Sequence, residues 1–234
     1  MNEAGVEVLL HKHVLVRAFE LAGVDQSLAG QLDPAEKARA ATIVDPPTRR
    51  DFIAGRAALR LMAAEVLDAA PHNLVSAYSC PDCGPHPLRS HGRPGYLVNG
   101  VTADLSISFS RSRGWALAAM VRAAEVPLGV DLQNIAQLAF DGFDDVALSP
   151  DEKLLLSRVA PEKRNAWRAA AWARKEALAK YSGLGLRTDP TLINAFPGKT
   201  EGVQGSEVDV RDVVSAEVGL PHGFAAAVAV RTRA

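Results

Sequence analysis

Four stretches of the chain carry apolar residues at the three- and four-residue spacing of a helix. Asp33 followed by Pro34 is typical of a helix start, and Ser149 with Glu152 three residues later forms the pattern of a capping box. The glycine at position 183 is typical of a helix end. The predicted helices cover residues 32–44, 46–68, 149–159 and 161–183.

The second of these helices has one apolar face and several arginines outside it. The helical period places on one face Phe52, Leu59, Met62 and Val66. The arginines at positions 49, 56 and 60 are expected to project elsewhere.

Strand patterns lie between the helices. Residues 104–110 alternate apolar and polar side chains, and residues 115–121 form an apolar run after a predicted turn at 111–114. Further strands are predicted over residues 128–135, 207–218 and 223–231, the last two as a closing antiparallel pair.

This order of elements predicts an α+β fold with two similar lobes related by a pseudo-two-fold axis. Each lobe is expected to pack a long helix on a mainly antiparallel sheet, with the active site between the lobes. The predicted lobes are residues 1–126 and residues 127–234. A doubly wound parallel sheet would need strands and helices in regular alternation, which the sequence does not supply.

Composition narrows the class of protein. The 234 residues are 48% hydrophobic and carry a formal net charge of -1, which gives no global case for binding nucleic acid or membranes. No stretch reaches the roughly 20 apolar residues of a membrane span, and the start of the chain does not read as a signal peptide. With two cysteines, close together, a cytoplasmic protein is expected.

The first segment with candidate chemistry is Gly-Val-Asp-Leu-Gln at positions 129–133. Residues two apart in a strand share a face, so Asp131 and Gln133 are expected to point the same way. An aspartate at a strand end is by itself more typical of a turn or cap than of a ligand. The strand alone therefore does not indicate a site.

The second segment is Trp-Ala-Arg-Lys-Glu-Ala-Leu-Ala-Lys at positions 172–180. Residues four apart stack on a helix, so Trp172, Glu176 and Lys180 form one ridge, although a Glu–Lys pair at this spacing is usually an exposed ion pair. The many basic residues of this helix predict that Glu176 stays ionised. If strand and helix pack together, two carboxylates and an amide oxygen converge, and oxygen ligands completed by water and phosphates suit Mg²⁺.

Together, these two segments and the Gly-Leu-Gly at 183–185 resemble the paired signature of the phosphopantetheinyl transferase superfamily. The likeness extends to the arginines within 50–60, to Gly-Arg-Pro at 92–94, to Ser-Ile-Ser at 106–108 and to the closing strands. It covers most of the chain between residues 35 and 230, at the length of the two-lobed Sfp type.

The resemblance implies a function. Members of the family move the 4′-phosphopantetheine arm of coenzyme A onto a serine of an apo acyl or peptidyl carrier protein, and release adenosine 3′,5′-bisphosphate. The family implies Mg²⁺ as cofactor, held by Asp131, Glu176 and, in place of a third acid, Gln133. It further implies catalytic roles for Glu176, which takes the serine proton, and for Lys180, which neutralises phosphate charge.

The resemblance also implies the residues that hold coenzyme A. Arg93 and Ser108 match phosphate-contacting positions, Lys175 and Lys180 lie in the signature helix, and Arg49, Arg50 and Arg56 are further candidates. Where the family usually has histidine in Ser-His-Ser, this chain has Phe109. Arg111 or Arg113 is expected to supply the missing charge.

One segment is outside this signature. Cys80 and Cys83, with His86 and His91 nearby, have part of the spacing of a structural Zn²⁺ site. A plain loop with reduced thiols and a labile disulfide are the other interpretations.

The expected protein is a monomer whose partners are coenzyme A and carrier domains of fatty-acid, polyketide or non-ribosomal peptide synthases, with no nucleic acid and no membrane. Carrier domains are acidic, which suits the basic flank of the cleft. Two alternatives remain: a catalytically weak relative that binds coenzyme A or carriers in a regulatory role, and a zinc-containing nucleic-acid-binding protein.

Overall fold

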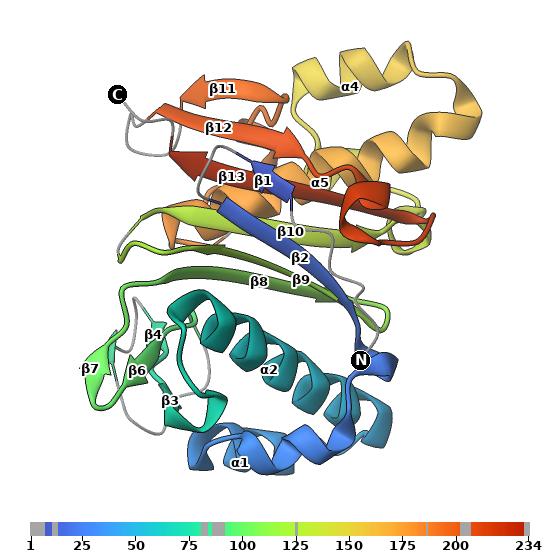
Figure 1. Ribbon diagram of the computed structural model, residues 1–234. Helices are drawn as coiled ribbons and strands as arrows, with labels where there is room; N and C mark the ends of the chain where they lie inside the picture. Colours follow the sequence, from blue (N-terminus) through green and yellow to red (C-terminus); the bar gives the residue numbers. More distant parts are fainter. Residues whose placement is uncertain are drawn as a thin grey trace.

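Two antiparallel four-stranded sheets stack face to face, and a long helix covers the outer side of each (Figure 1). The computed structural model describes residues 8–10, 14–80, 84–85, 92–124, 126–185, 187–201 and 207–231. The helices are α1 (Pro34–Ala41), α2 (Pro46–Leu67), α3 (Phe143–Ala147), α4 (Pro150–Ser157) and α5 (Arg164–Ser182). The structure therefore has the predicted α+β class.

The first sheet has the strand order β1-β2-β9-β8 and the second β10-β13-β12-β11. Their strands are β1 (Val8–Leu10), β2 (Val14–Glu20), β8 (Ser106–Ser112), β9 (Trp115–Val121), β10 (Leu128–Asn134), β11 (Gly198–Glu201), β12 (Glu207–Asp212) and β13 (Phe224–Arg231). Small sheets are formed by β3 (Leu74–Ser76), β6 (Tyr96–Val98) and β7 (Val101–Thr102), and by β4 (Ser79–Cys80) and β5 (Gly84–Pro85).

Both large sheets pair strands in a similar way. β2 pairs with β9 and β9 with β8, while β10 pairs with β13 and β13 with β12, all antiparallel. In the first sheet β2 therefore lies beside β9, and in the second β10 lies beside β13. In each case the chain between the two strands contains the long helix. This order is what two similar lobes require. The lobe boundary between residues 126 and 127 stays a prediction.

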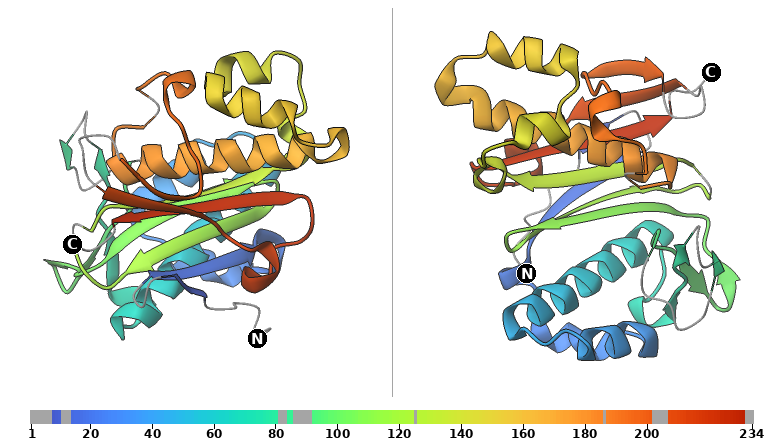
Figure 2. Two further views of the ribbon diagram at one scale, coloured as in Figure 1. Left: turned by 90° about the horizontal axis from the view of Figure 1, so that it is seen from above. Right: turned by 180° about the vertical axis from the view of Figure 1, so that it is seen from behind.

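The core between the sheets is built from alternate residues of their strands. Val14 and Val16 of β2 belong to one buried cluster with Leu128 and Val130 of β10 and with apolar residues of β13. The opposite residues of β10 and β13 face α5, which lies across both strands (Figure 2). Val130 therefore points into the core and Asp131 away from it.

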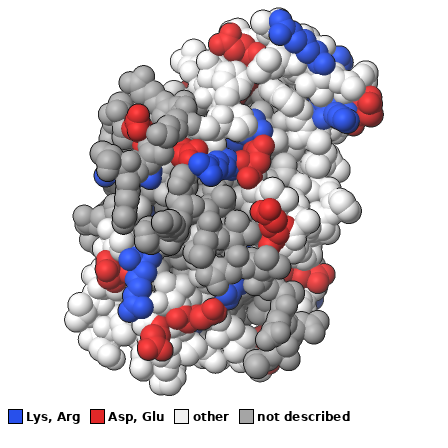
Figure 3. Space-filling view, turned by 45° about the horizontal axis from the view of Figure 1, so that its top comes forward, with Lys and Arg blue, Asp and Glu red and all other residues white. Residues whose placement is uncertain are grey.

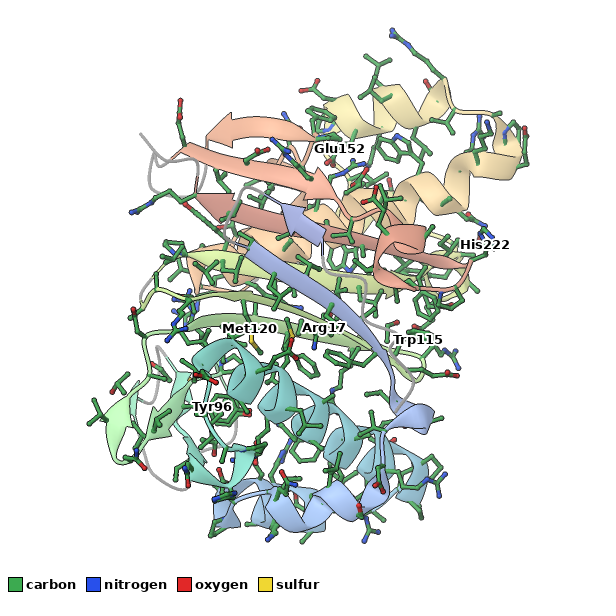
Figure 4. All side chains as sticks on the ribbon, in the orientation of Figure 1. Arg17, Tyr96, Trp115, Met120, Glu152 and His222 are labelled. Carbon is green, nitrogen blue, oxygen red and sulfur yellow. The ribbon has the colours of Figure 1, made fainter. Side chains whose placement is uncertain are left out.

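α2 packs on the outer face of the first sheet, where Met120 lies close to Tyr96 and to the helix (Figure 4). Arg60 of this helix is 1% exposed, although it lies outside the apolar face. Its Nη2 donates to Glu36 at 2.5 Å and to Asp33 at 3.1 Å. α1 lies against this side of α2 and brings both carboxylates, so Arg60 belongs to a buried ion-pair network.

The end of β8 also differs from the prediction. The strand runs from Ser106 to Ser112, and the turn to β9 is only Arg113 and Gly114, both with positive φ (46° and 76°). A two-residue hairpin loop with both residues in the left-handed region has the twist that neighbouring antiparallel strands need. The strands β1, β2 and β11 and the helix α3 were not predicted from the sequence.

Charge on the surface is mixed, since lysines, arginines and acidic residues are interspersed over the described part of the face in Figure 3. Among the described residues, no helix is both long and apolar enough to cross a bilayer.

Gly129 allows α5 to lie directly on β10. A Cβ at this position would be 1.8 Å from the carbonyl oxygen of Ala177 and 2.7 Å from the amide nitrogen of Tyr181. Because both clashing atoms belong to the helix backbone, no side-chain movement can relieve them. Any residue other than glycine would push α5 away from the strand that carries Asp131.

We therefore expect Gly129→Ala to lower the free energy of unfolding by about 3 kcal/mol or more, at the upper end of overpacking effects. Gly30→Ala is the matched control, because a Cβ at Gly30 would meet no atom within 4 Å. Urea denaturation of both variants measures the difference. Equal stability of the two variants would contradict the close approach of helix and strand.

Candidate functional site

Two adjoining cavities open where residues of the two large sheets meet, with volumes of about 460 and 440 Å³. Both are lined by Gly92, Pro94, Phe109 and Lys180. The first is also lined by Arg93, Ser108, Leu128 and residues 182–185, and the second by Thr48, Arg56, Ser110, Arg111 and Arg113. Each is large enough to hold part of a nucleotide-sized ligand.

Asp131 lies beside these cavities and is held from two sides. It is 3% exposed. Its Oδ1 accepts hydrogen bonds from the Ser110 hydroxyl and from Lys180 Nζ, both at 2.7 Å. Its Oδ2 accepts one from Gln133 Nε2 at 2.6 Å. Three donors on a buried carboxylate fix its orientation.

Lys180 joins the two halves of the site. Besides Asp131, its Nζ donates to the carbonyl oxygens of Val130 at 2.9 Å and Phe109 at 3.4 Å. Phe109 belongs to β8 and Val130 to β10, so one ammonium group contacts an edge strand of each sheet. The lysine side chain is 30% exposed, which leaves it open to the cavities.

Glu176 lies one helical turn before Lys180, on the ridge that the sequence predicted. Burial, and then the negative charge of Asp131, raise the pKa of Glu176, while Lys180 opposes the shift. Of the basic residues of the helix, Lys180 is the one that lowers the pKa of this carboxyl, and the expectation that Glu176 stays ionised remains a prediction. The neighbouring helix residues Arg174 and Lys175 form ion pairs with other acids, Asp212 and Glu152 respectively.

Two carboxylates and one amide are thus brought together as expected from the spacing. Among the described residues, no cluster of three or more histidine, cysteine, aspartate or glutamate side chains could hold a metal ion. The set here has only two acids, because its third member is Gln133. The amide nitrogen of Gln133 donates a hydrogen bond to Asp131, whereas a third carboxylate at this position would repel Asp131.

Arg93 and Ser108 both line the first cavity. Arg93 Nη2 lies 3.5 Å from the carbonyl oxygen of Lys180 and 3.4 Å from that of Tyr181, at the negative end of α5. The Ser108 hydroxyl accepts a hydrogen bond from the Val130 amide at 2.8 Å. The structure places both predicted phosphate contacts beside Lys180.

Of the arginines on α2, the structure brings Arg56 to the second cavity but not Arg49. Arg56 stacks over Tyr78 at 4.4 Å and over Phe52 at 5.1 Å, measured to the ring centroids. Arg111 lies 5.4 Å from the same Phe52 ring. Partial desolvation, and then the like charge of Arg56, lower the pKa of Arg111.

Arg49 is a correction, since it lies in the first turn of α2 and its Nη2 donates to the Val44 carbonyl at 3.4 Å. It lines neither of the two cavities. Its position about two turns before Arg56 places it at the N-terminal end of the helix.

Lys175 is a second correction. It is 0% exposed and its Nζ lies 2.6 Å from Glu152 Oε2. The same ammonium donates to the carbonyl oxygens of Pro190 at 2.6 Å and Ile193 at 2.7 Å. Being one residue from Glu176, it projects from a different side of α5, toward α4, where Glu152 is labelled in Figure 4. Lys175 therefore links α5 to α4 and to residues 190–193, and it lines neither of the two cavities.

Ser110 was not predicted as a site residue. The alternation of serines at 106, 108, 110 and 112 is visible in the sequence, but the polar face of a strand usually meets solvent. In the structure this face is turned toward β10 and largely buried.

The candidate zinc segment is only partly described. Cys80 is buried at the end of β4. Cys83, His86 and His91 lie outside the described residues, so a zinc site here stays a prediction.

Comparisons with known proteins match less than half of the chain. No curated protein is significantly similar to the chain. The crystal structure of holo-[acyl-carrier-protein] synthase from Neisseria meningitidis matches 46% of this chain and 98% of its own, at 18% identity and a TM-score of 0.34. The family model of the 4′-phosphopantetheinyl transferase superfamily matches residues 127–228. These residues include Asp131, Gln133, Glu176 and Lys180. The resemblance drawn from the sequence is thereby confirmed over residues 127–228, which match the model of the 4′-phosphopantetheinyl transferase superfamily.

Proposed function

We propose that the protein is an Sfp-type 4′-phosphopantetheinyl transferase, which moves the phosphopantetheine arm of coenzyme A onto a serine of an apo carrier protein with the help of Mg²⁺. The observation that carries this proposal is the meeting of Asp131, Glu176 and Lys180 beside two cavities lined with arginines. Phosphoryl transfer needs little else from a protein than a metal, cations on the phosphates and an aligned hydroxyl.

The residues present fit a magnesium ion. The pKa of Glu176 is raised by burial and by Asp131, so a divalent cation would relieve both the repulsion and the desolvation. Asp131 and Glu176, with the amide oxygen of Gln133, would supply oxygen ligands, and the ion would neutralise charge on the pyrophosphate of coenzyme A. Two acids in place of three predict weaker binding of the ion.

Glu176 is the proposed general base. The raised pKa of Glu176 is closer to neutral pH, and a general base is most effective when its pKa is near the pH at which it works. It would take the proton from the carrier serine, whose oxygen forms a bond to the phosphorus that carries the pantetheine arm. The bond from that phosphorus to the bridging oxygen breaks, and adenosine 3′,5′-bisphosphate leaves with the bridging oxygen.

Lys180 would stabilise the negative charge that grows on this bridging oxygen, because it is partly exposed between both cavities. Arg93 and Ser108 would contact phosphate in the first cavity. Arg56, with Arg111 in the position of the missing histidine charge, would do so in the second. Phe109 lines both cavities and supplies an apolar wall in place of that histidine.

The Sfp type is favoured because both sheets, each with its long helix, belong to one chain and together line the cavities. A monomer would therefore have a complete site. The carrier domain would dock at the rim of the cleft; the fatty-acid, polyketide and non-ribosomal peptide carriers all present the same acceptor serine.

A second candidate is a relative that binds coenzyme A or carriers without efficient transfer. The substitution of an acid by Gln133 and of a histidine by Phe109 favour it, since both remove polar interactions with the substrate or ion.

The first test is intact-mass analysis of apo-carrier domains from the three synthase classes after incubation with coenzyme A, Mg²⁺ and the protein. We expect the mass of one phosphopantetheine group to be added to at least one carrier, and no addition with Asp131→Asn. The matched control Asp141→Asn, an exposed aspartate outside the site, should retain transfer. Coenzyme A binding without transfer to any carrier would favour the second candidate.

The two lysines of the signature helix should differ in their effects. Lys180→Met is expected to reduce kcat at least about a hundredfold, because a cation at the reacting phosphate is lost. Lys175→Met should instead lower stability by about 3–5 kcal/mol, since Glu152 would stay buried without its partner. Turnover and urea denaturation separate the two. A Lys175→Met protein of normal stability that has lost turnover would show that Lys175 acts at the site.

Glu176→Gln should abolish transfer and raise the Tm of the metal-free protein by a few degrees. Because the folded-state pKa of Glu176 is raised, its ionised form is destabilising at neutral pH. The difference in Tm should shrink as the pH falls through the raised folded-state pKa, and it should vanish below the usual glutamate pKa of about 4.3, where Glu176 is protonated in both the folded and the unfolded state. Thermal unfolding between pH 4 and pH 7, at values chosen around that pKa, measures it. A Tm gain that grows on acidification would contradict the shift.

A further inference from the structure

β8 presents a row of serine hydroxyls to the edge of β10. Ser106, Ser108, Ser110 and Ser112 occupy alternate positions and so share one face of the strand. Three of these hydroxyls accept a hydrogen bond from a backbone amide, of Val126, Val130 and Asn134, at 2.9, 2.8 and 3.2 Å. They satisfy amide groups that an unpaired sheet edge would otherwise leave exposed.

Ser110 departs from this pattern. Its hydroxyl donates to Asp131 Oδ1 at 2.7 Å, and the hydrogen bond is buried. Ser110 is 8% exposed and Asp131 3% exposed. A carboxylate can only accept, so the direction of this bond is fixed. Of the four serines in the row, Ser110 is the one tied to a charged side chain.

The chemistry of the three donors on Asp131 differs. Lys180 brings a positive charge, which opposes the approach of a second cation to the same oxygen. The Ser110 hydroxyl is neutral, so it can keep its hydrogen bond while a divalent ion binds. The Gln133 amide is also neutral but holds the other oxygen, Oδ2. Ser110 is therefore the donor that can orient Oδ1 independently of Lys180.

We propose that Ser110 is a positioning residue, which fixes the orientation of the Asp131 carboxylate for the divalent ion while Lys180 turns to the substrate phosphates. The inference rests on the proposed function. It assigns Ser110 no contact with substrate: the residue acts through Asp131. It also gives the first half of the chain a defined part in a metal site whose ligands all belong to the second half.

Ser110→Ala, Ser110→Thr and the control Ser106→Ala test this assignment. Ser106 has the same strand face and the same exposed fraction of 8% as Ser110, but its hydroxyl contacts the backbone at Val126 and Ala123. Binding of Mn²⁺ in the presence of coenzyme A, followed by electron paramagnetic resonance, gives an affinity without turnover. Tm values show that each variant is folded.

We expect Ser110→Ala to weaken Mn²⁺ binding roughly tenfold, the effect of losing a hydrogen bond to a charged group. It should also lower kcat while the KM for the carrier is unchanged. Ser110→Thr, which keeps the hydroxyl, should remain within about threefold of the wild type, as should Ser106→Ala. If Ser110→Ala does not fold, Ser110→Cys, with its weaker donor, should show the loss of affinity.

Two contrary outcomes have different meanings. Equal Mn²⁺ affinity of Ser110→Ala and Ser106→Ala, with normal binding by the wild type, would overturn the role of Ser110 and leave the proposed function standing. No saturable Mn²⁺ binding by the wild type with coenzyme A would overturn both.

Discussion

The contact between α5 and β10 is the constraint on which the site depends. Asp131 lies on a strand and Lys180 on a helix, and their 2.7 Å ion pair exists only because the helix backbone can reach the strand at Gly129. The same close approach brings the Glu176 carboxyl near enough to Asp131 for the two charges to affect each other. Since Lys180 also contacts the Phe109 carbonyl, the contact extends to the first sheet.

Electrostatics at this contact are unbalanced in a way that suits a cation. Two carboxylates share one nearby ammonium group, and burial makes the imbalance stronger. Other charged groups of α5 do not correct it, because Arg174 is paired with Asp212 and Lys175 with Glu152. A site that served only stability would be expected to pair its buried charges one to one, as Lys175 is paired with Glu152.

Much of this arrangement could be read from periodicity. The two-residue period of the strand placed Asp131 and Gln133 on one face, and the four-residue spacing of the helix placed Glu176 beside Lys180. The same helical period argues against Lys175, which lies one residue off that ridge; adjacency in the sequence was the misleading signal. The burial of Arg60 and of the β8 serines could not be predicted, since it depends on which elements pack against those faces.

The departures from the family pattern have a common physical consequence. A third carboxylate at position 133 would repel Asp131 until an ion arrived, whereas the Gln133 amide donates a hydrogen bond to it. With Ser110 on the other oxygen, the carboxylate is oriented in the protein itself. At position 109, a charged or polar contact is likewise replaced by an aromatic wall, and Arg111 stands close by over Phe52. Positions 133 and 109 thus carry uncharged residues, while hydrogen bonds and stacking fix the geometry of the charged groups that remain. An arrangement of this kind lowers the affinity for an ion while reducing the reorganisation that its binding requires.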